Sequence, residues 1–73
     1  MTIEQFRAFQ RSRPFRWFAI HVADGRMLEV RHPEVVSASP NGRTIFVYNA
    51  DGMREVLDLL LVTSLRPLTM RLA

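Results

Sequence analysis

The fold of this 73-residue chain is decided by residues 15–31, which read FRWFAIHVADGRMLEVR. From Phe15 onward apolar side chains recur at every second position, as in a strand with one buried face. The residues expected on that face are Phe18, Ile20 and Val22. Asp24-Gly25 then separates this run from a second alternating run, and Asp-Gly favours a tight hairpin because both residues adopt positive φ at low cost. The stretch therefore predicts a β-hairpin.

Further strands are predicted downstream of the hairpin. His32-Pro33 interrupts the pairing, because proline has no N–H to donate and restricts the residue before it. Residues 44–48 (TIFVY) have the β-branched and aromatic content of a strand, and turn signals stand on both sides of them, at 39–42 and 49–52. Turns about ten residues apart are typical of consecutive antiparallel strands.

Residues 53–62 fit either a strand or a helix, because their apolar side chains match both periods. We choose a strand, on the rhythm of the turns, and expect a short turn near residues 62–64. In the tail, apolar and polar residues alternate over 68–72 after Pro67, which predicts an edge strand.

The N-terminus predicts a short helix over residues 2–11. Thr2 and Gln5 have the capping-box spacing, and Ile3, Phe6 and Phe9 recur on one side. We therefore expect one domain over 1–73, with a helix at 2–11 and strands within 15–72. The expected fold is mainly β with a short N-terminal helix, arranged as a small antiparallel SH3-like or Sm-like barrel of four to five strands.

The sequence predicts no catalytic site, metal site or cofactor. There is no cysteine, and His21 and His32 are too few for a zinc site built from histidines. The serines lack the Gly-x-Ser-x-Gly context of a nucleophile, and three glycines cannot form a phosphate-binding loop. The longest apolar run, residues 59–62, is far too short to span a membrane, and no signal peptide is present, so we expect a cytoplasmic protein.

All ten basic residues are arginine, and the formal net charge is +3. A coding bias toward arginine explains this best. The alternative is nucleic-acid binding, because the planar guanidinium suits phosphates and base edges. The most basic stretch runs from Arg7 to Arg16, and it contains no acidic residue. The candidate nucleic-acid residues are Arg7, Arg11, Arg13, Arg16, Trp17 and Arg31.

Trp17 has two expected placements. Exposed among arginines, it would stack on the bases of a single strand. Buried beneath the helix, it would contact Phe6 and Phe9, and this is the placement we favour.

The C-terminal part predicts self-association. Residues 59–62 are apolar at successive positions, so a strand there would have two apolar faces, of which the core covers only one. A neighbouring copy that adds strand to strand would cover the other. The candidate residues are Leu59, Leu61, Leu68, Met70 and Leu72.

The chain resembles a group of short bacterial proteins that have no assigned function. The segments that carry the resemblance are Pro14–Phe18, Asp24-Gly25-Arg26, Val30–Glu34 and Asp58–Val62. The resemblance covers nearly the whole chain and implies a fold but no activity. The group has Pro where this chain has Trp17, so a role for Trp17 would be peculiar to this chain.

The order of elements is also similar to that of Sm-like RNA chaperones, which form rings and bind RNA around the pore. Those proteins contact RNA through a Lys and a His, whereas the corresponding region here reads Leu57-Asp58-Leu59. The likeness therefore does not imply RNA binding at a pore.

Two hypotheses follow from the sequence. The first is a non-catalytic, self-associating binding module that holds RNA or single-stranded DNA on its arginine-rich N-terminal surface. The second is a structural or adaptor subunit that docks on another protein and does not bind nucleic acid. Neither involves a membrane.

Overall fold

The computed structural model describes residues 1–49 and 51–68. Its elements, in chain order, are α1 (Ile3–Gln10), β1 (Phe18–Val22), β2 (Met27–Val30), the 3₁₀ turn η1 (Pro33–Val35), β3 (Val36–Ala38), β4 (Thr44–Tyr48), β5 (Arg54–Asp58), the 3₁₀ turn η2 (Leu59–Leu61) and β6 (Val62–Pro67). The expectation of a mainly β protein with one short N-terminal helix is confirmed.

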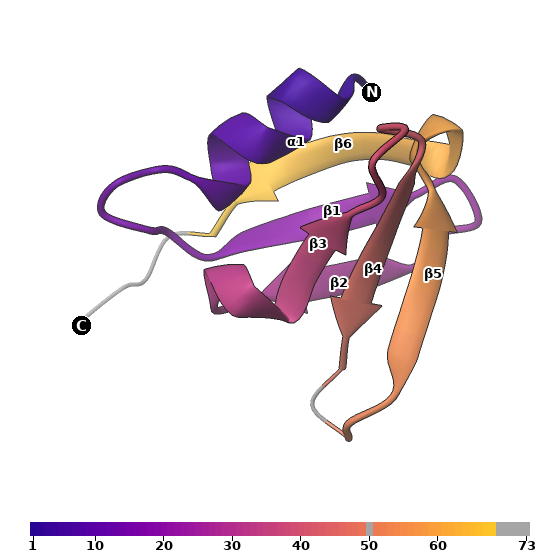
Figure 1. Cartoon of the computed structure of the whole chain (residues 1–73). Coiled ribbons are helices and arrows are strands. Elements are labelled where there is room, and N and C mark those ends of the chain that lie inside the picture. Colours follow the sequence, from indigo (N-terminus) through magenta and orange to yellow (C-terminus); the bar gives the residue numbers. More distant parts are fainter. Residues whose placement is uncertain (50, 69–73) are drawn as a thin grey trace.

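The strands form two three-stranded antiparallel sheets, in the orders β2-β1-β6 and β3-β4-β5. Figure 1 shows that β4 and β5 run steeply across the direction of β1 and β6, and that α1 lies over the β6 and β1 side. The chain passes from the first sheet to the second through η1, which links β2 to β3. The two sheets do not join into a closed barrel.

The predicted hairpin is present, as β1 and β2. Ile20 pairs with Leu28, and the turn between the strands contains Gly25 at a φ of +95°, a conformation that glycine adopts without a side-chain clash. Phe18, Ile20 and Val22 are buried, as their alternation predicts. The hairpin is thus fixed both by its turn and by its apolar face.

The capping box at the start of α1 is also confirmed. The Gln5 amide donates to Thr2 Oγ1 over 3.2 Å, and the Thr2 amide donates to Gln5 Oε1 over 3.0 Å. The box fixes the start of the helix, and Phe6 in its first turns is fully buried. Its ring meets Phe18 of β1 edge to face, with the ring centroids 6.5 Å apart. The helix is therefore part of the core.

The core lies between the two sheets and beneath α1. Every side chain in it is apolar. The buried strand residues alternate along their strands except in β1, where Ala19 is also buried on the face opposite Phe18. Its buried cluster comprises Phe6, Phe18, Ile20, Val22, Val30, Val36, Ile45, Val47, Leu57, Leu59 and Val62.

The expected strand over residues 53–62 is wrong in its second half. β5 ends at Asp58, whose side chain accepts a hydrogen bond from the Leu60 amide over 2.9 Å and so starts the turn η2. The turn expected near 62–64 is wrong for the same reason: the chain has already turned, and Val62 pairs with Val22 of β1. Within residues 1–49 and 51–68 the last strand is β6, which ends at Pro67, before the tail strand expected at 68–72. Of that tail, residues 69–73 lie outside the described residues.

Over residues 1–49 and 51–68, no helix has the length and apolar character needed to cross a membrane.

Candidate nucleic-acid interface

The arginine-rich segment of residues 11–17 connects α1 to β1 at one end of the molecule. Its start is held by Gln10, whose side-chain amide donates to the carbonyl oxygens of Pro33, over 3.3 Å, and Val36, over 2.9 Å. Its other end is held by the Leu68 amide, which donates to the Trp17 carbonyl over 2.9 Å. The loop is therefore anchored to β3 on one side and to the end of β6 on the other.

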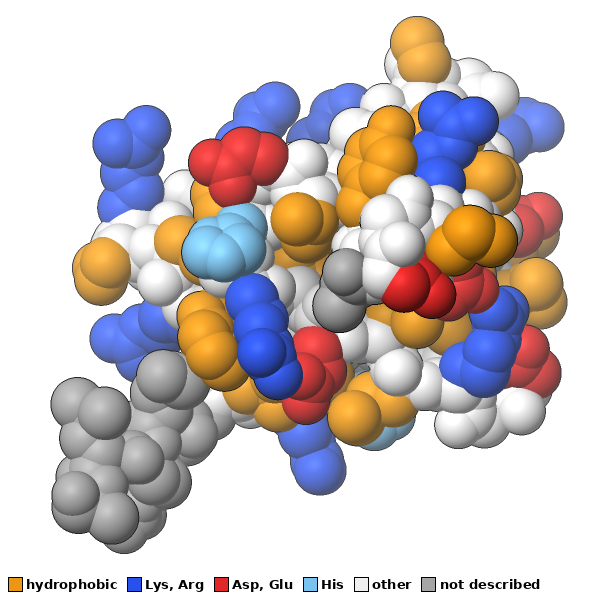
Figure 2. All heavy atoms as spheres, turned by 90° about the horizontal axis from the view of Figure 1, so that it is seen from below, with side chains coloured by type: hydrophobic (Ala, Val, Ile, Leu, Met, Phe, Trp, Pro, Cys, Tyr) orange, Lys and Arg blue, Asp and Glu red, His pale blue; other side chains and the backbone are white. Residues whose placement is uncertain are grey.

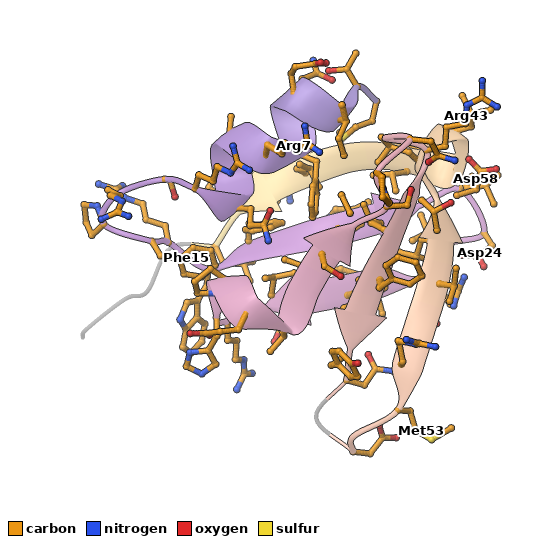
Figure 3. All side chains as sticks on the ribbon, viewed as in Figure 1. Arg7, Phe15, Asp24, Arg43, Met53 and Asp58 are labelled. Carbon is orange, nitrogen blue, oxygen red and sulfur yellow. The ribbon has the colours of Figure 1, made fainter. Side chains whose placement is uncertain are left out.

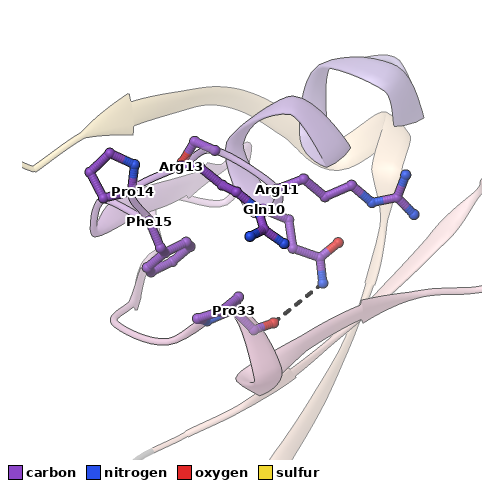
Figure 4. A pocket seen from close by; sticks show the side chains of 7 residues that line it. Gln10, Arg11, Arg13, Pro14, Phe15 and Pro33 are labelled. Carbon is purple, nitrogen blue, oxygen red and sulfur yellow. Dashed lines mark hydrogen bonds between the residues drawn. The ribbon is translucent and has the colours of Figure 1, made fainter.

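One side of this loop forms an open hollow beside Phe15, which we name the Phe15 hollow (Figure 4). Phe15 is half-buried and meets Phe18 edge to face at 6.1 Å, so its ring is fixed by the core. Arg11 and Arg13 are exposed at its rim. The hollow is lined by Gln10, Arg11, Ser12, Arg13, Pro14, Phe15 and Pro33.

The other side of the loop forms a second hollow, the Trp17 hollow, which shares Ser12 with the first. Its walls are mostly apolar, and Arg16 is its one charged residue. Apolar walls with a cation at the rim suit the face of an aromatic ligand that carries negative charge. The hollow is lined by Ala8, Phe9, Ser12, Arg16, Trp17 and Pro67.

Trp17 is half-buried, which differs from the burial against Phe6 that we favoured. The place beneath α1 is taken by Phe18, which meets both Phe6 and Phe9 edge to face. Trp17 precedes β1 and lines the Trp17 hollow together with Ala8 and Phe9 of the helix. The alternation of β1 could have indicated this, since it assigns Trp17 to the face opposite Phe18.

Arg31, which follows β2, stacks over Trp17 with its Cζ atom 4.8 Å from the ring centroid. It also forms an ion pair with Glu29, at an Nη2–Oε1 distance of 2.9 Å. Both partners of this pair are exposed, at 57% and 40%, so the pair contributes at most about 1 kcal/mol. Arg31 therefore joins the edge of β2 to the Trp17 hollow.

The positive charge of this end of the molecule is not neutralised within the described part of the chain. The ion pairs there involve only Arg26 and Arg31, so the four arginines of residues 7–16 have no carboxylate partner among residues 1–49 and 51–68. Arg7 lies on α1 one turn before Arg11 and lines neither hollow. Figure 3 shows Phe15 at one end of the molecule and Asp24, Arg43 and Asp58 at the other.

Arg26, in the hairpin turn, has a structural role at that other end. It bonds Asp24 within the turn, with an Nε–Oδ2 distance of 2.8 Å, and forms an ion pair with Glu55 of β5, which also accepts a hydrogen bond from Asn49. This group connects the first sheet to the second. The backbone amide of Arg26, and then its side chain, lower the pKa of Asp24, although partial desolvation opposes them. No local pattern indicates Glu55 as a partner, because it lies 29 positions from Arg26 along the chain.

The residues expected to mediate self-association have different positions. Leu59 is a core residue with 4% of its surface exposed, whereas its neighbour Leu60 is 84% exposed and Leu61 is 51% exposed. Leu68 is half-buried, and Met70 and Leu72 lie outside the described residues. The exposed pair belongs to η2, between β5 and β6, and each of these two strands is an edge of its sheet.

Comparison with known proteins gives no relative: no family model matches the chain, and no curated protein or solved structure matches it significantly. What the protein does must therefore be inferred from the two hollows, the arginines around them and the exposed edges.

Proposed function

We propose that this protein is a cytoplasmic, non-catalytic module that binds RNA or single-stranded DNA at residues 11–17 and assembles with copies of itself. The observation that carries the proposal is the position of the unpaired arginines. Arg11 and Arg13 surround the Phe15 hollow, and Arg16 lines the Trp17 hollow. Each hollow thus offers an aromatic ring for a base together with a guanidinium for the adjoining phosphate.

A single strand fits this surface better than a duplex does. In a duplex the bases stack on one another, and their faces are not available to protein rings. In a single strand each base can leave the stack and lie against an aromatic side chain, and this contact is worth about 1–3 kcal/mol per base. The loop is fixed to the fold by Gln10 and by the Trp17 carbonyl, so its backbone needs little ordering when the nucleic acid binds.

Trp17 makes this proposal testable without a label, because it is the only tryptophan in the chain. A base that stacks on it is expected to quench its fluorescence. We expect quenching by RNA or DNA oligonucleotides of about twelve nucleotides at low salt, a length within the range of known single-strand sites. The affinity should fall as salt rises, because arginines that bind phosphates release counterions. Absence of binding at about 20 mM salt, or binding that does not respond to salt, would refute nucleic-acid binding.

Self-association is supported by two of the sheet edges, those of β5 and β6. β5 and β6 each pair on one side only within the described part of the chain, and the exposed Leu60 and Leu61 lie between them. If β5 of one copy adds to β6 of the next, two different surfaces meet, and such contacts close into a ring when the rotation allows it. Light scattering over a range of protein concentrations tests this. A mass that stays that of one chain at every concentration contradicts it.

The finer fold that accompanies this proposal is an SH3-like or Sm-like barrel, in which the two sheets are the two halves. Two features support it. β2 leads through η1 directly into β3, and a 3₁₀ turn precedes the last strand, which returns to pair with β1. A solved structure in which β5 and β6 pair, within a chain or between copies, would settle this.

The second candidate function is that of an adaptor subunit. It is favoured by the exposed apolar side chains Val56, Leu60 and Leu61, which lie on β5 and η2 and not on the arginine-rich loop. An adaptor would bind one protein partner in a fixed ratio. It would show neither Trp17 quenching nor salt-dependent binding of oligonucleotides, so the fluorescence titration separates the two functions.

A further inference from the structure

The side of the molecule away from α1 has an opening between the end of β2 and the end of β4, which we name the Tyr48 hollow. The helix covers the opposite side of the sheets (Figure 1). Figure 2 views the molecule from below, where hydrophobic side chains, a histidine and basic side chains lie next to one another at the surface. The hollow is lined chiefly by Met27, Leu28, Val35 and Tyr48, with Arg31 and His32 at one side.

Tyr48 is the aromatic residue of this hollow, and 49% of its surface is exposed. Its cross-strand partner on β5 is Arg54, which places its guanidinium over Phe46 instead, 5.6 Å from that ring's centroid. The tyrosine is therefore left available beside Met27, which is 50% exposed. A half-exposed aromatic ring in a hollow lined by both apolar and polar residues can offer its face to a flat ligand.

Arg31 connects this hollow to the proposed interface. It lines the Tyr48 hollow and also stacks over Trp17. A nucleic-acid strand whose bases reach Trp17 can therefore continue past Arg31 to Tyr48, and its backbone stays close to a positively charged side chain on the way. Glu29 also lines the hollow, but its negative charge is paired with Arg31. Because that pair is exposed and weak, a phosphate can replace the carboxylate at the guanidinium.

We propose that the Tyr48 hollow binds one further base of the same single strand, stacked on Tyr48, with Arg31 holding the phosphate between this base and the one at Trp17. The inference rests on the proposed function and extends it, because it assigns a second stacking ring outside the arginine-rich loop. The bound nucleic acid then runs from the loop of residues 11–17, around the edge of β2, to the side of the molecule away from α1.

The test compares Tyr48→Ala with Tyr48→Phe, and uses Met53→Ala as the matched control. Met53 is 63% exposed, lies on the same β4–β5 hairpin and does not line the hollow. We expect Tyr48→Ala to weaken binding of an oligonucleotide of about twelve nucleotides by about 5- to 150-fold, which is the loss of one stacked base. Tyr48→Phe and Met53→Ala should both bind like the wild type, because the first keeps a ring and the second lies outside the path.

Trp17 fluorescence separates the two proposals. If the wild type is quenched and Tyr48→Ala binds as tightly as the wild type, the Tyr48 base site is wrong while the nucleic-acid interface stands. If the oligonucleotide neither quenches Trp17 of the wild type nor binds to the protein, the proposed function itself fails.

A cross-linking experiment on the unmodified protein tests the site even if Tyr48→Ala does not fold. An oligonucleotide that contains 4-thiouridine is irradiated with the wild type, and the adducts are mapped after trypsin digestion. Cleavage after arginine places Tyr48 in residues 44–54 and Trp17 in residues 17–26, so the two contacts are distinguished. Adducts in both peptides are expected. Adducts in 17–26 with none in 44–54 would overturn the Tyr48 site.

Discussion

The side-chain amide of Gln10 donates a hydrogen bond to the carbonyl oxygen of Val36 over 2.9 Å, and in this way the end of α1 is attached to the start of β3. The same amide reaches the carbonyl of Pro33 over 3.3 Å. Since both bonds are partly buried, Gln10→Ala leaves two carbonyl oxygens poorly satisfied. We expect the free energy of unfolding to fall by about 1–2 kcal/mol, measured by urea denaturation.

Gln10→Glu is the sharper variant for the same contact. It keeps the size of the side chain but removes the donor and brings a carboxylate toward two carbonyl oxygens. It should therefore destabilise the protein at neutral pH at least as much as Gln10→Ala does. If Gln10→Glu is as stable as the wild type, the side chain does not anchor the loop.

Leu59 and Leu60 form a matched pair, because they are adjacent residues of one type with 4% and 84% exposure. Leu59→Ala creates a cavity between the sheets and should lower the free energy of unfolding by about 2–5 kcal/mol. Leu60→Ala should change it by less than about 0.5 kcal/mol, as expected for a surface position. Both are measured by urea denaturation at a protein concentration at which light scattering gives the mass of one chain, so that a contact of Leu60 with a second copy does not contribute. Equal losses in the two variants would contradict the burial of Leu59 and the exposure of Leu60.

The same pair shows where sequence reasoning succeeds and where it stops. Elements fixed by local chemistry were predictable: Thr2 and Gln5 mark the helix start, and Asp24-Gly25 marks the hairpin. At residues 59–62 every side chain is apolar, so periodicity could not say which would be buried. The outcome depends on Asp58, which caps a turn, and on Val62, which pairs with β1. The cap at Asp58 is a local hydrogen bond, and the pairing of Val62 is a long-range contact. The pattern of apolar residues indicates neither of them.

The candidate site was also predictable only in part, because local patterns show its residues but not the contacts that bring them together. The arginines were visible as a run without acids, and the structure places Arg11, Arg13 and Arg16 at two hollows of one loop. The hollows themselves depend on how the helix meets the sheet, and on Phe18 rather than Trp17 lying beneath it. The role of Gln10 depends on residues 23 and 26 positions away, which no local pattern indicates.

Asp24 predicts a pH dependence of stability. The backbone amide of Arg26, 3.0 Å away, and then the Arg26 side chain lower the pKa of Asp24 in the folded protein. A carboxyl group whose pKa is lower in the folded state stabilises the fold above its unfolded pKa of about 3.9, and this contribution is lost as the pH falls through the folded pKa. The wild type should therefore lose more stability than Asp24→Asn when the pH is lowered from 7 into this acidic range.

The cause of that pH dependence can be divided by a second variant. Arg26→Gln keeps the backbone amide that bonds Asp24 but removes the guanidinium, so the loss of stability in acid should lie between that of the wild type and that of Asp24→Asn. The measurement is the free energy of unfolding in urea at each pH. If all three proteins lose the same amount, Asp24 does not contribute.

The salt dependence of oligonucleotide binding should identify which arginines contact phosphates. For single strands the slope of log affinity against log salt changes by about 0.7 for each phosphate contact that is lost. We therefore expect Arg11→Gln and Arg13→Gln each to reduce the slope by about that amount. Arg43→Gln is the control, because Arg43 is exposed, has no ion-pair partner among residues 1–49 and 51–68, and lies at the end of the molecule away from Phe15 (Figure 3). All three variants lower the net charge by one, so a general effect of charge would reduce the three slopes equally and would contradict a localised interface. Reductions confined to Arg11 and Arg13 would place the phosphates at the Phe15 hollow, since the control removes the same charge from the wrong end.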